Sequence, residues 1–180
     1  MIDKKIILLF VICGTLYSSA IAQRIIQRRP AQEQATRKRD AGNPLDSVKS
    51  IFPNASKIDP LNSYWNAAKD QKGNTLGFVF SSLEYGKENK GFGDDVPTWV
   101  ITDKKGIIKK VCIINSYETR SYQRLVHRKK FYQQWVGKTL EESKNMKVDI
   151  VSGATLTSTA IKNNMQLIIG NALRNKPANR

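Results

Sequence analysis

The sequence predicts an α+β fold, in which an antiparallel sheet of hairpins carries packed helices within a single domain. Two pairs of strand-like segments, each joined by a short turn, indicate the hairpins: residues 64–70 with 75–82, and residues 98–103 with 107–116. Apolar residues at helical spacing in residues 157–174 indicate a helix that packs on this sheet.

Two further helices are expected before this last one. Residues 45–52, LDSVKSIF, form a short amphipathic helix that Pro53 closes. Residues 122–137 predict one continuous helix, and Gly137 is its expected stop signal. The positions at helical spacing in that helix are Leu125, Arg128, Phe131/Tyr132 and Trp135/Val136. In the last helix the core stripe is Ile161, Met165, Ile168 and Ala172, reinforced by Ile169 and Leu173.

The chain divides into three parts. Residues 1–22 have the layout of a signal peptide, with an apolar run followed by a small-residue pattern at Ala20 and Ala22, and we expect cleavage after Ala22 or use of the segment as a membrane anchor. Residues 23–44 are polar and basic and predict a linker. Residues 45–175 form the globular domain.

Arginines follow the apolar run and favour a cytoplasmic position for that flank, yet the overall layout favours export. The formal net charge of +15 indicates anionic partners or a membrane surface, or a basic protein kept soluble by its charge. After cleavage Cys112 is the only cysteine and His127 the only histidine, so we expect no disulfide and no metal site of the His/Cys type. No pair of nucleophile and base is evident, and we assign no catalytic residue.

The segment from Val148 to Ala160, VDIVSGATLTSTA, carries the chemistry. Gly153 allows a turn, and Thr155, Thr157 or Ser158 is expected to cap the helix that follows. A helix start offers free backbone N–H groups and a positive dipole end, which favour a phosphate. The alternative is an ordinary helix cap with a glycine turn.

The same segment resembles the D-x-x-[ST]-G-A-T attachment motif of the FMN-binding domain family. This family includes the flavoprotein subunits of the Rnf complexes and of the sodium-pumping NADH:quinone oxidoreductase. The resemblance extends from Ile51 to about Leu173, through the successive blocks FPNA, LGFVF, YGKENKGFG, GIIKKVCIINSYET, FYQQWVGK and VDIVSGATLTS.

The resemblance implies that FMN is joined covalently, through its phosphate, to the hydroxyl of Thr155. It implies further cofactor-binding positions around that bond. They are Asp149, Ser152, Gly153, Ala154, Thr157, Gly91, Gly93, Glu118 and Thr119. One block departs from the family, since ETRSYQ stands where the family has E-T-P-G-L-G, so that loop needs a different backbone. Tyr117 and Tyr122 could stack on the flavin there or pack ordinarily.

The implied function is that of an exported electron-transfer flavoprotein, periplasmic or anchored on the outer side of the cytoplasmic membrane. Its implied partners are a flavin transferase for maturation and redox proteins in trans, including a membrane electron-transport complex; we expect no nucleic acid. We expect a redox carrier rather than a stand-alone enzyme. The alternatives are a non-flavin module whose basic surface binds anionic ligands or membrane, a protein that binds FMN non-covalently, and a flavoenzyme for a small substrate.

Overall fold

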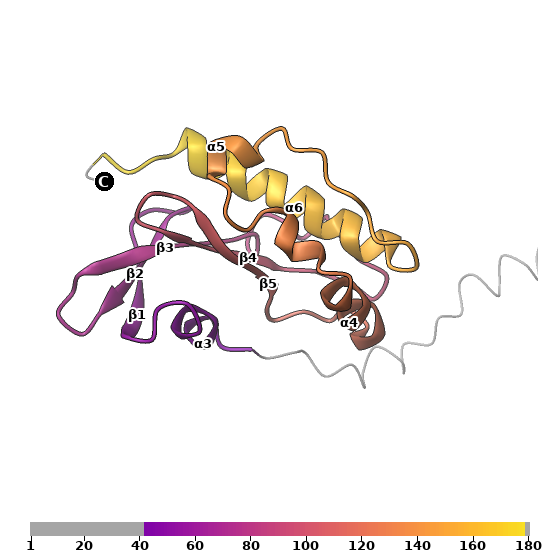
Figure 1. The fold of residues 1–180 in the computed structure, drawn as a ribbon, viewed down its shortest axis with the longest axis horizontal. Coiled ribbons are helices and arrows are strands. Elements are labelled where there is room, and N and C mark those ends of the chain that lie inside the picture. The colour runs from indigo at the N-terminus through magenta and orange to yellow at the C-terminus, as the bar shows by residue number, and fades with distance from the viewer. Residues whose placement is uncertain (1–41, 179–180) are drawn as a thin grey trace, which may run out of the picture. The chain divides into compact units, whose positions relative to one another are not determined.

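The sheet of the protein is a meander of five antiparallel strands (Figure 1). The computed structural model describes residues 42–178. The strands lie in chain order and are β1 (Ala55–Pro60), β2 (Asn66–Asp70), β3 (Thr75–Ser81), β4 (Thr98–Asp103) and β5 (Ile108–Ile113). The predicted α+β class is therefore confirmed, and so are both hairpins, β2–β3 and β4–β5.

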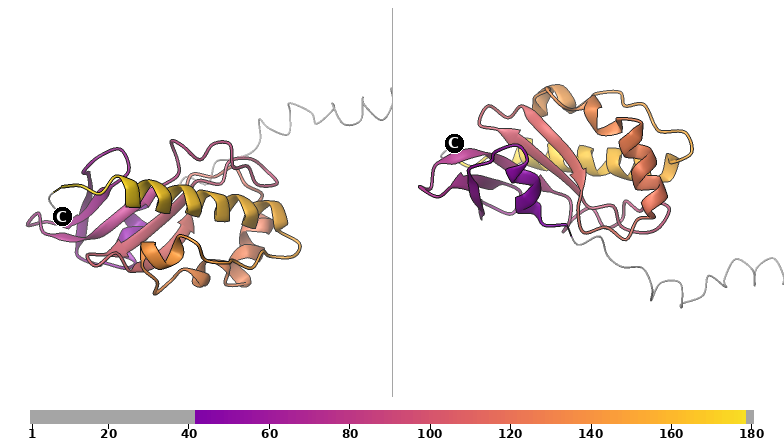
Figure 2. Two further views of the ribbon diagram at one scale, coloured as in Figure 1. Left: turned by 90° about the horizontal axis from the view of Figure 1, so that it is seen from above. Right: turned by 60° about the horizontal axis from the view of Figure 1, so that its bottom comes forward.

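Helices cover both faces of the sheet. On one face lie α5 (Leu140–Ser143) and α6 (Thr155–Arg174), and on the other lies α3 (Pro44–Lys49), as Figure 1 shows. Seen from above, α6 crosses over the strands (Figure 2). Alternate residues of β3 serve the two faces, because successive side chains of a strand point in opposite directions: Phe78 and Phe80 join the core under α6, and Val79 joins the core under α3.

The core beneath α6 is the larger one and is rich in aromatic residues. The Trp65 ring meets Phe78 and Phe80 edge to face, with centroid distances of 5.0 and 4.8 Å. The indole Nε1 of Trp65 donates a hydrogen bond of 2.9 Å to the carbonyl of Ala172, which anchors the C-terminal end of α6. The expected stripe of α6 is buried, from Ile161 to Ala172, and only Leu173 is half-buried.

The single helix expected over residues 122–137 is wrong. The chain forms α4 (Arg120–Arg128), turns through Lys130 in a left-handed conformation with φ of 54°, and continues as the 3₁₀ helix η1 (Phe131–Gln134). Long-range pairing overrides the helical spacing: the N–H of Gly137 donates to the carbonyl of Ile108 at 2.8 Å, and the N–H of Ile108 donates to Lys138 at 2.8 Å.

The break in the helix redistributes its side chains. Val126 is the buried residue of α4, Leu125 is half-buried, and Arg128 is exposed. Gly137 does stand at the stop, with φ of +86°. Two elements were not expected at all: the polar edge strand β1, and the short α5. Among residues 42–178 no helix is long and apolar enough to cross a membrane, and the proposed leader at 1–22 and most of the proposed linker at 23–44 lie outside the described residues.

Candidate functional site

The motif before α6 is a turn held by its neighbours. The side-chain amide of Gln134 pairs with the backbone of Asp149, accepting from its N–H at 2.8 Å and donating to its carbonyl at 3.1 Å. The N–H of Ala154 then donates to the carbonyl of Val151 at 3.0 Å, closing a turn around Gly153. Gly153 has φ of +80°, a conformation that other residues rarely adopt. The glycine of the motif is thus required by the backbone.

The start of α6 has no side-chain cap, which corrects the expectation that Thr155, Thr157 or Ser158 provides one. Ala154 occupies the N-cap position, and no side chain accepts a cap hydrogen bond there. The Ser158 hydroxyl instead donates to the carbonyl of Ala154 at 2.8 Å and accepts from the N–H of Val151 at 3.2 Å. The residues with hydroxyls begin one position too late, since a cap must precede the first turn.

Thr155 is therefore the first residue of α6, and its side chain is exposed. The first N–H groups of a helix have no acceptor within the helix, and the helix dipole is positive at this end. Ala154 has no side-chain oxygen to cap these groups, and Thr155 and Leu156 are exposed, so an external acceptor can reach the helix start beside the Thr155 hydroxyl. This geometry suits a phosphate ester on Thr155.

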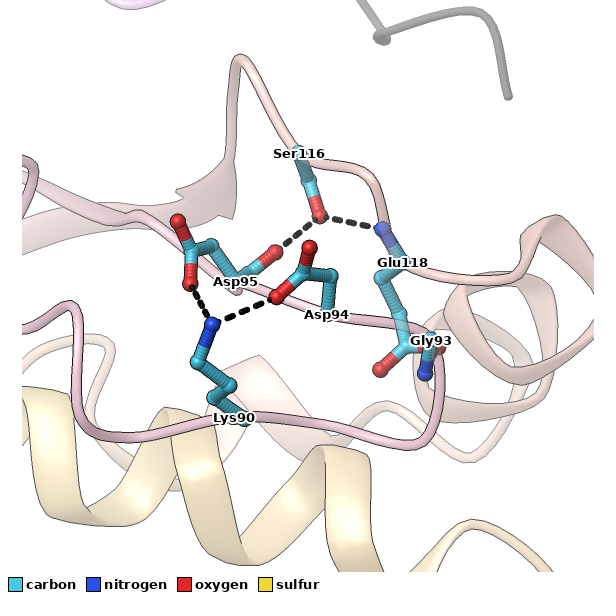
Figure 3. A network of polar contacts seen from close by, with 6 residues as sticks. All are labelled: Lys90, Gly93, Asp94, Asp95, Ser116 and Glu118. Atoms are coloured by element: carbon cyan, nitrogen blue, oxygen red, sulfur yellow. Dashed lines mark hydrogen bonds and ion pairs between the residues drawn. The ribbon is translucent and has the colours of Figure 1, made fainter. Parts of the chain in front are cut away.

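The carboxylate of Glu118 lies beneath this helix start and joins three segments. The side chain is buried, with 4% of its surface exposed. Its Oε1 accepts from the N–H of Gly93 at 2.9 Å and from its neighbour Thr119 at 2.6 Å, and its Oε2 accepts from the hydroxyl of Thr157 at 3.1 Å. Figure 3 shows Glu118 directed toward Gly93. The structure thus brings together four of the residues that the resemblance marked, from three separate segments.

Gly91 and Gly93 of the 84–97 loop are needed for close packing on this segment. A Cβ at Gly91 would overlap the Oε2 of Glu118, and a Cβ at Gly93 would lie 2.9 Å from the carbonyl oxygen of Tyr117 and the nitrogen of Thr119. Real Cβ atoms do not approach so closely. Both glycines therefore serve first to let the loop reach the Glu118 carboxylate.

A polar network behind Glu118 holds the same loop (Figure 3). The Ser116 hydroxyl donates to the carbonyl of Asp95 at 2.8 Å and accepts from the N–H of Glu118 at 2.9 Å. Lys90 forms ion pairs with Asp94 at 2.7 Å and Asp95 at 3.2 Å. The hydrogen bond that Lys90 donates to Asp94, followed by the one it donates to Asp95, raises the pKa of Lys90 above its usual range.

Asn164 of α6 anchors the loop from the other side and was missed by the sequence reasoning. Its side chain is fully buried, donates to the carbonyl of Val96 at 2.8 Å and accepts from the amide of Asn89 at 2.8 Å. The signal that could have revealed Asn164 is a polar residue within an otherwise apolar helical stripe. Ser116, two residues before Glu118, was missed as well.

Each of the three segments that Glu118 joins carries one exposed apolar side chain, and we call these side chains the apolar rim: Phe92, Tyr117 and Leu156. Their exposed fractions are 42%, 37% and 58%. Each is the direct chain neighbour of a residue that bonds to or includes the Glu118 carboxylate, so they come from the same three segments. Tyr122 does not belong to the rim but packs against Phe92, with ring centroids 4.8 Å apart.

The departure ETRSYQ has a structural explanation. Thr119 is the N-cap residue of α4, and the next residues form its first turn. The side-chain amide of Gln123 donates to the carbonyl of Glu118 at 3.0 Å. A helix therefore begins directly after Glu118, at the place where a proline and two glycines would form a loop.

Residues 91–170 match the family model described as the FMN-binding domain. The match includes the glycine loop, Glu118 and the whole S-G-A-T motif, and it ends within α6. No curated protein matches the chain.

Proposed function

The chain belongs, through residues 91–170, to the FMN-binding domain family, and on that premise we propose that it is an extracytoplasmic electron carrier with FMN esterified to Thr155. Its maturation would need a flavin transferase, and its electrons would come from and go to redox proteins in trans. The observation that carries the proposal is the exposed Thr155 hydroxyl at an uncapped helix start.

The phosphate fits the start of α6. A phosphodiester carries about one negative charge, because it lacks the second ionisation of a free phosphate ester. The first N–H groups of the helix, which have no acceptor within the helix, and the positive end of the helix dipole suit that charge. Ala154, with no polar side chain at the N-cap, supplies no competing acceptor.

The ring system fits the apolar rim. Phe92, Tyr117 and Leu156 expose apolar surface next to the segments that meet at Glu118. Aromatic and aliphatic side chains of this kind pack favourably on a flat aromatic ring. Bound FMN supplies reversible uptake and release of electrons, and the protein positions and tunes it.

Glu118 supports the site without reaching outward. Its two oxygens are occupied by Gly93, Thr119 and Thr157. It therefore fixes the glycine loop against the first turn of α6, so that the position of the apolar rim relative to Thr155 stays the same. The exposed position of Thr155 and of the nearby Asp149 also leaves the motif accessible to a modifying enzyme.

The test is to produce the full chain together with a flavin transferase and measure the mass of the acid-precipitated polypeptide. We expect an added FMN moiety on the peptide that contains Thr155, with flavin fluorescence that stays with the protein. Thr155→Val should remove both signals. Thr159→Val, the same substitution one turn further along α6, should keep them.

Three outcomes separate the alternatives. A wild-type protein that is colourless and has its unmodified mass would falsify the proposal and favour a non-flavin module. Flavin that is released by acid from wild-type protein and retained by Thr155→Val before acid treatment would indicate non-covalent binding. Steady turnover of a small substrate by the flavinylated protein alone would indicate an enzyme.

A further inference from the structure

A basic groove lies beside α4. It has a volume of about 1150 Å³ and runs between β5 and the segment formed by α4 and η1. None of the motif residues lines it. The lining residues that matter here are the cationic Lys110, Arg124, Arg128 and Lys130, together with His127 and an apolar floor.

The positive charge of this groove is not neutralised within the protein. None of its four cationic side chains forms an ion pair with an acidic residue among residues 42–178; Lys110 donates instead to the Ser50 hydroxyl at 2.9 Å. The sequence from Thr119 to Leu140 contains no aspartate or glutamate. Unpaired charges of one sign on concave walls concentrate the field and attract an oppositely charged partner.

The floor of the groove is apolar. Val111 is buried there, and Ile113 and Tyr132 are half-buried. Burial raises the pKa of both the Cys112 thiol and the Tyr132 phenol, so neither adds negative charge. An apolar centre with a charged rim is the usual anatomy of a protein–protein interface. A flat membrane surface would meet the cationic rim but would not fill the concave floor.

The groove and the flavin site are joined by one helix. Leu125 of α4 packs toward Gly153 of the motif, since a Cβ on that glycine would lie 3.3 Å from Leu125 Cδ2. Its chain neighbour Arg124 lines the groove. The same helix begins directly after Glu118 and Thr119. A partner seated in the groove would thus lie one helix away from Thr155.

We propose that this groove docks an acidic redox protein that exchanges electrons with the flavin. The inference rests on the proposed electron-carrier function and adds the chemistry of the partner. The basic sequence between residues 23 and 41 is a poor occupant, because its charge has the same sign as the groove. Complementary charges mainly accelerate encounter and fix orientation, and they weaken as salt increases.

The test uses an acidic [2Fe–2S] ferredoxin as the probe and the full-length flavinylated protein. The groove variant carries Arg124→Glu and Arg128→Glu. The matched control carries Lys72→Glu and Lys144→Glu, an equal change in charge at two exposed lysines outside the groove. At low ionic strength we expect the groove variant to lose about tenfold or more in ferredoxin affinity and in the rate of flavin reduction by ferredoxin. The control should retain both within about threefold.

Each other result counts against the inference or against the proposed function on which it rests. Equal weakening by both double variants would show that only net charge matters, and absence of binding by the wild type at low salt would exclude this class of partner. Groove-dependent binding to phosphatidylglycerol vesicles without binding to ferredoxin would assign the groove to a membrane. Ferredoxin binding is also measured with the colourless Thr155→Val protein. If this variant binds ferredoxin and the wild type carries no flavin, the proposed function is refuted but the docking surface is retained.

Discussion

The short helix α5 has a side-chain cap at its start, and the long helix α6 has none. The four-residue α5 has a complete capping box: the Thr139 hydroxyl accepts from the N–H of Glu142 at 3.2 Å, and the Glu142 carboxylate accepts from the N–H of Thr139 at 2.7 Å. The twenty-residue α6 has no side-chain cap at Ala154. A short helix needs its cap to form at all, whereas the packed stripe of α6 stabilises that helix and leaves its first turn available for a ligand.

The C-terminal end of α6 strengthens the contrast. There the carbonyl of Ala172 accepts from Trp65, and the carbonyl of Asn171 accepts from both the N–H and the side chain of Asn175, at 3.0 and 2.9 Å. The C-terminal carbonyls of α6 therefore have hydrogen-bond partners outside the helix, whereas its start beside Thr155 has no side-chain cap. The end without a side-chain cap is the one that the proposed function assigns to the flavin phosphate.

The largest expected effect comes from removing the support beneath the open start. Glu118→Ala would leave the N–H groups of Gly93 and Thr119 and the Thr157 hydroxyl without their acceptor. We expect a loss of about 3 kcal/mol in the free energy of unfolding, measured by urea denaturation. Glu118→Gln keeps the shape and one carbonyl oxygen and should lose only about 1 kcal/mol. Equal losses for the two variants would show that the carboxylate is not the link between these segments.

The comparison itself is tested by two matched threonine substitutions in protein without flavin. Thr139→Ala removes a cap and should lower the free energy of unfolding by about 1 kcal/mol. Thr155→Ala removes a hydroxyl that caps nothing and should change it by less than about 0.5 kcal/mol. A larger cost at Thr155 than at Thr139 would contradict the assignment of the open start.

Closing the open start should produce a smaller effect in the opposite direction. Ala154→Ser places a hydroxyl at the N-cap of α6 and should raise the unfolding free energy of the colourless protein by about 0.5 kcal/mol. Because the new oxygen competes for the same N–H groups, the yield of flavin attachment under limiting transferase should fall. Both quantities are measured on the same preparations, by urea denaturation and by intact mass. An unchanged yield of flavin attachment despite a more stable helix would show that the phosphate does not use the N–H groups that the new cap occupies.

The smallest expected effect is the contribution of Glu142 to the pH dependence of stability. The bond from the backbone N–H of Thr139, followed by the Thr139 hydroxyl, holds the pKa of Glu142 below its ordinary value. A carboxyl group whose pKa is lower in the folded state stabilises the fold above its unfolded-state pKa and loses this effect as pH falls through the folded value. The urea midpoints of wild type and Glu142→Gln should therefore differ at pH 7 and converge below about pH 4. A difference that persists in acid would mean that the charge is not involved.

Local patterns predicted the elements whose stability is local. Both hairpins, the helix around Val48 and the apolar stripe of α6 follow from alternation and helical spacing, and the structure confirms them. The same reasoning failed at Lys130, because residues 137 and 138 pair with Ile108 far back in the chain. It also missed β1, a polar edge strand whose pairing with β2 leaves little apolar alternation to detect.

The candidate site shows a similar division. The S-G-A-T motif and Glu118 came from resemblance, and helix-start chemistry suggested a seat for a phosphate. Gly91 and Gly93 do more than make the loop turn, since a side chain at either position would collide with Glu118 or the backbone beside it. Ser116 and Asn164 were not foreseen, because their partners are main-chain atoms of the 84–97 loop, and nothing in the local sequence indicates which carbonyl a buried side chain will meet.

The order of the elements along the chain has a consequence for biosynthesis. The strands of the sheet pair with their chain neighbours, and α6 is the last of the described elements to follow. A nascent chain that has not reached α6 leaves Trp65, Phe78 and Phe80 open to proteases and chaperones. The same unfinished chain also lacks Thr155, the residue to which the proposed function assigns the flavin. Under the proposed function, covalent flavin would therefore mark only chains whose synthesis has continued into α6.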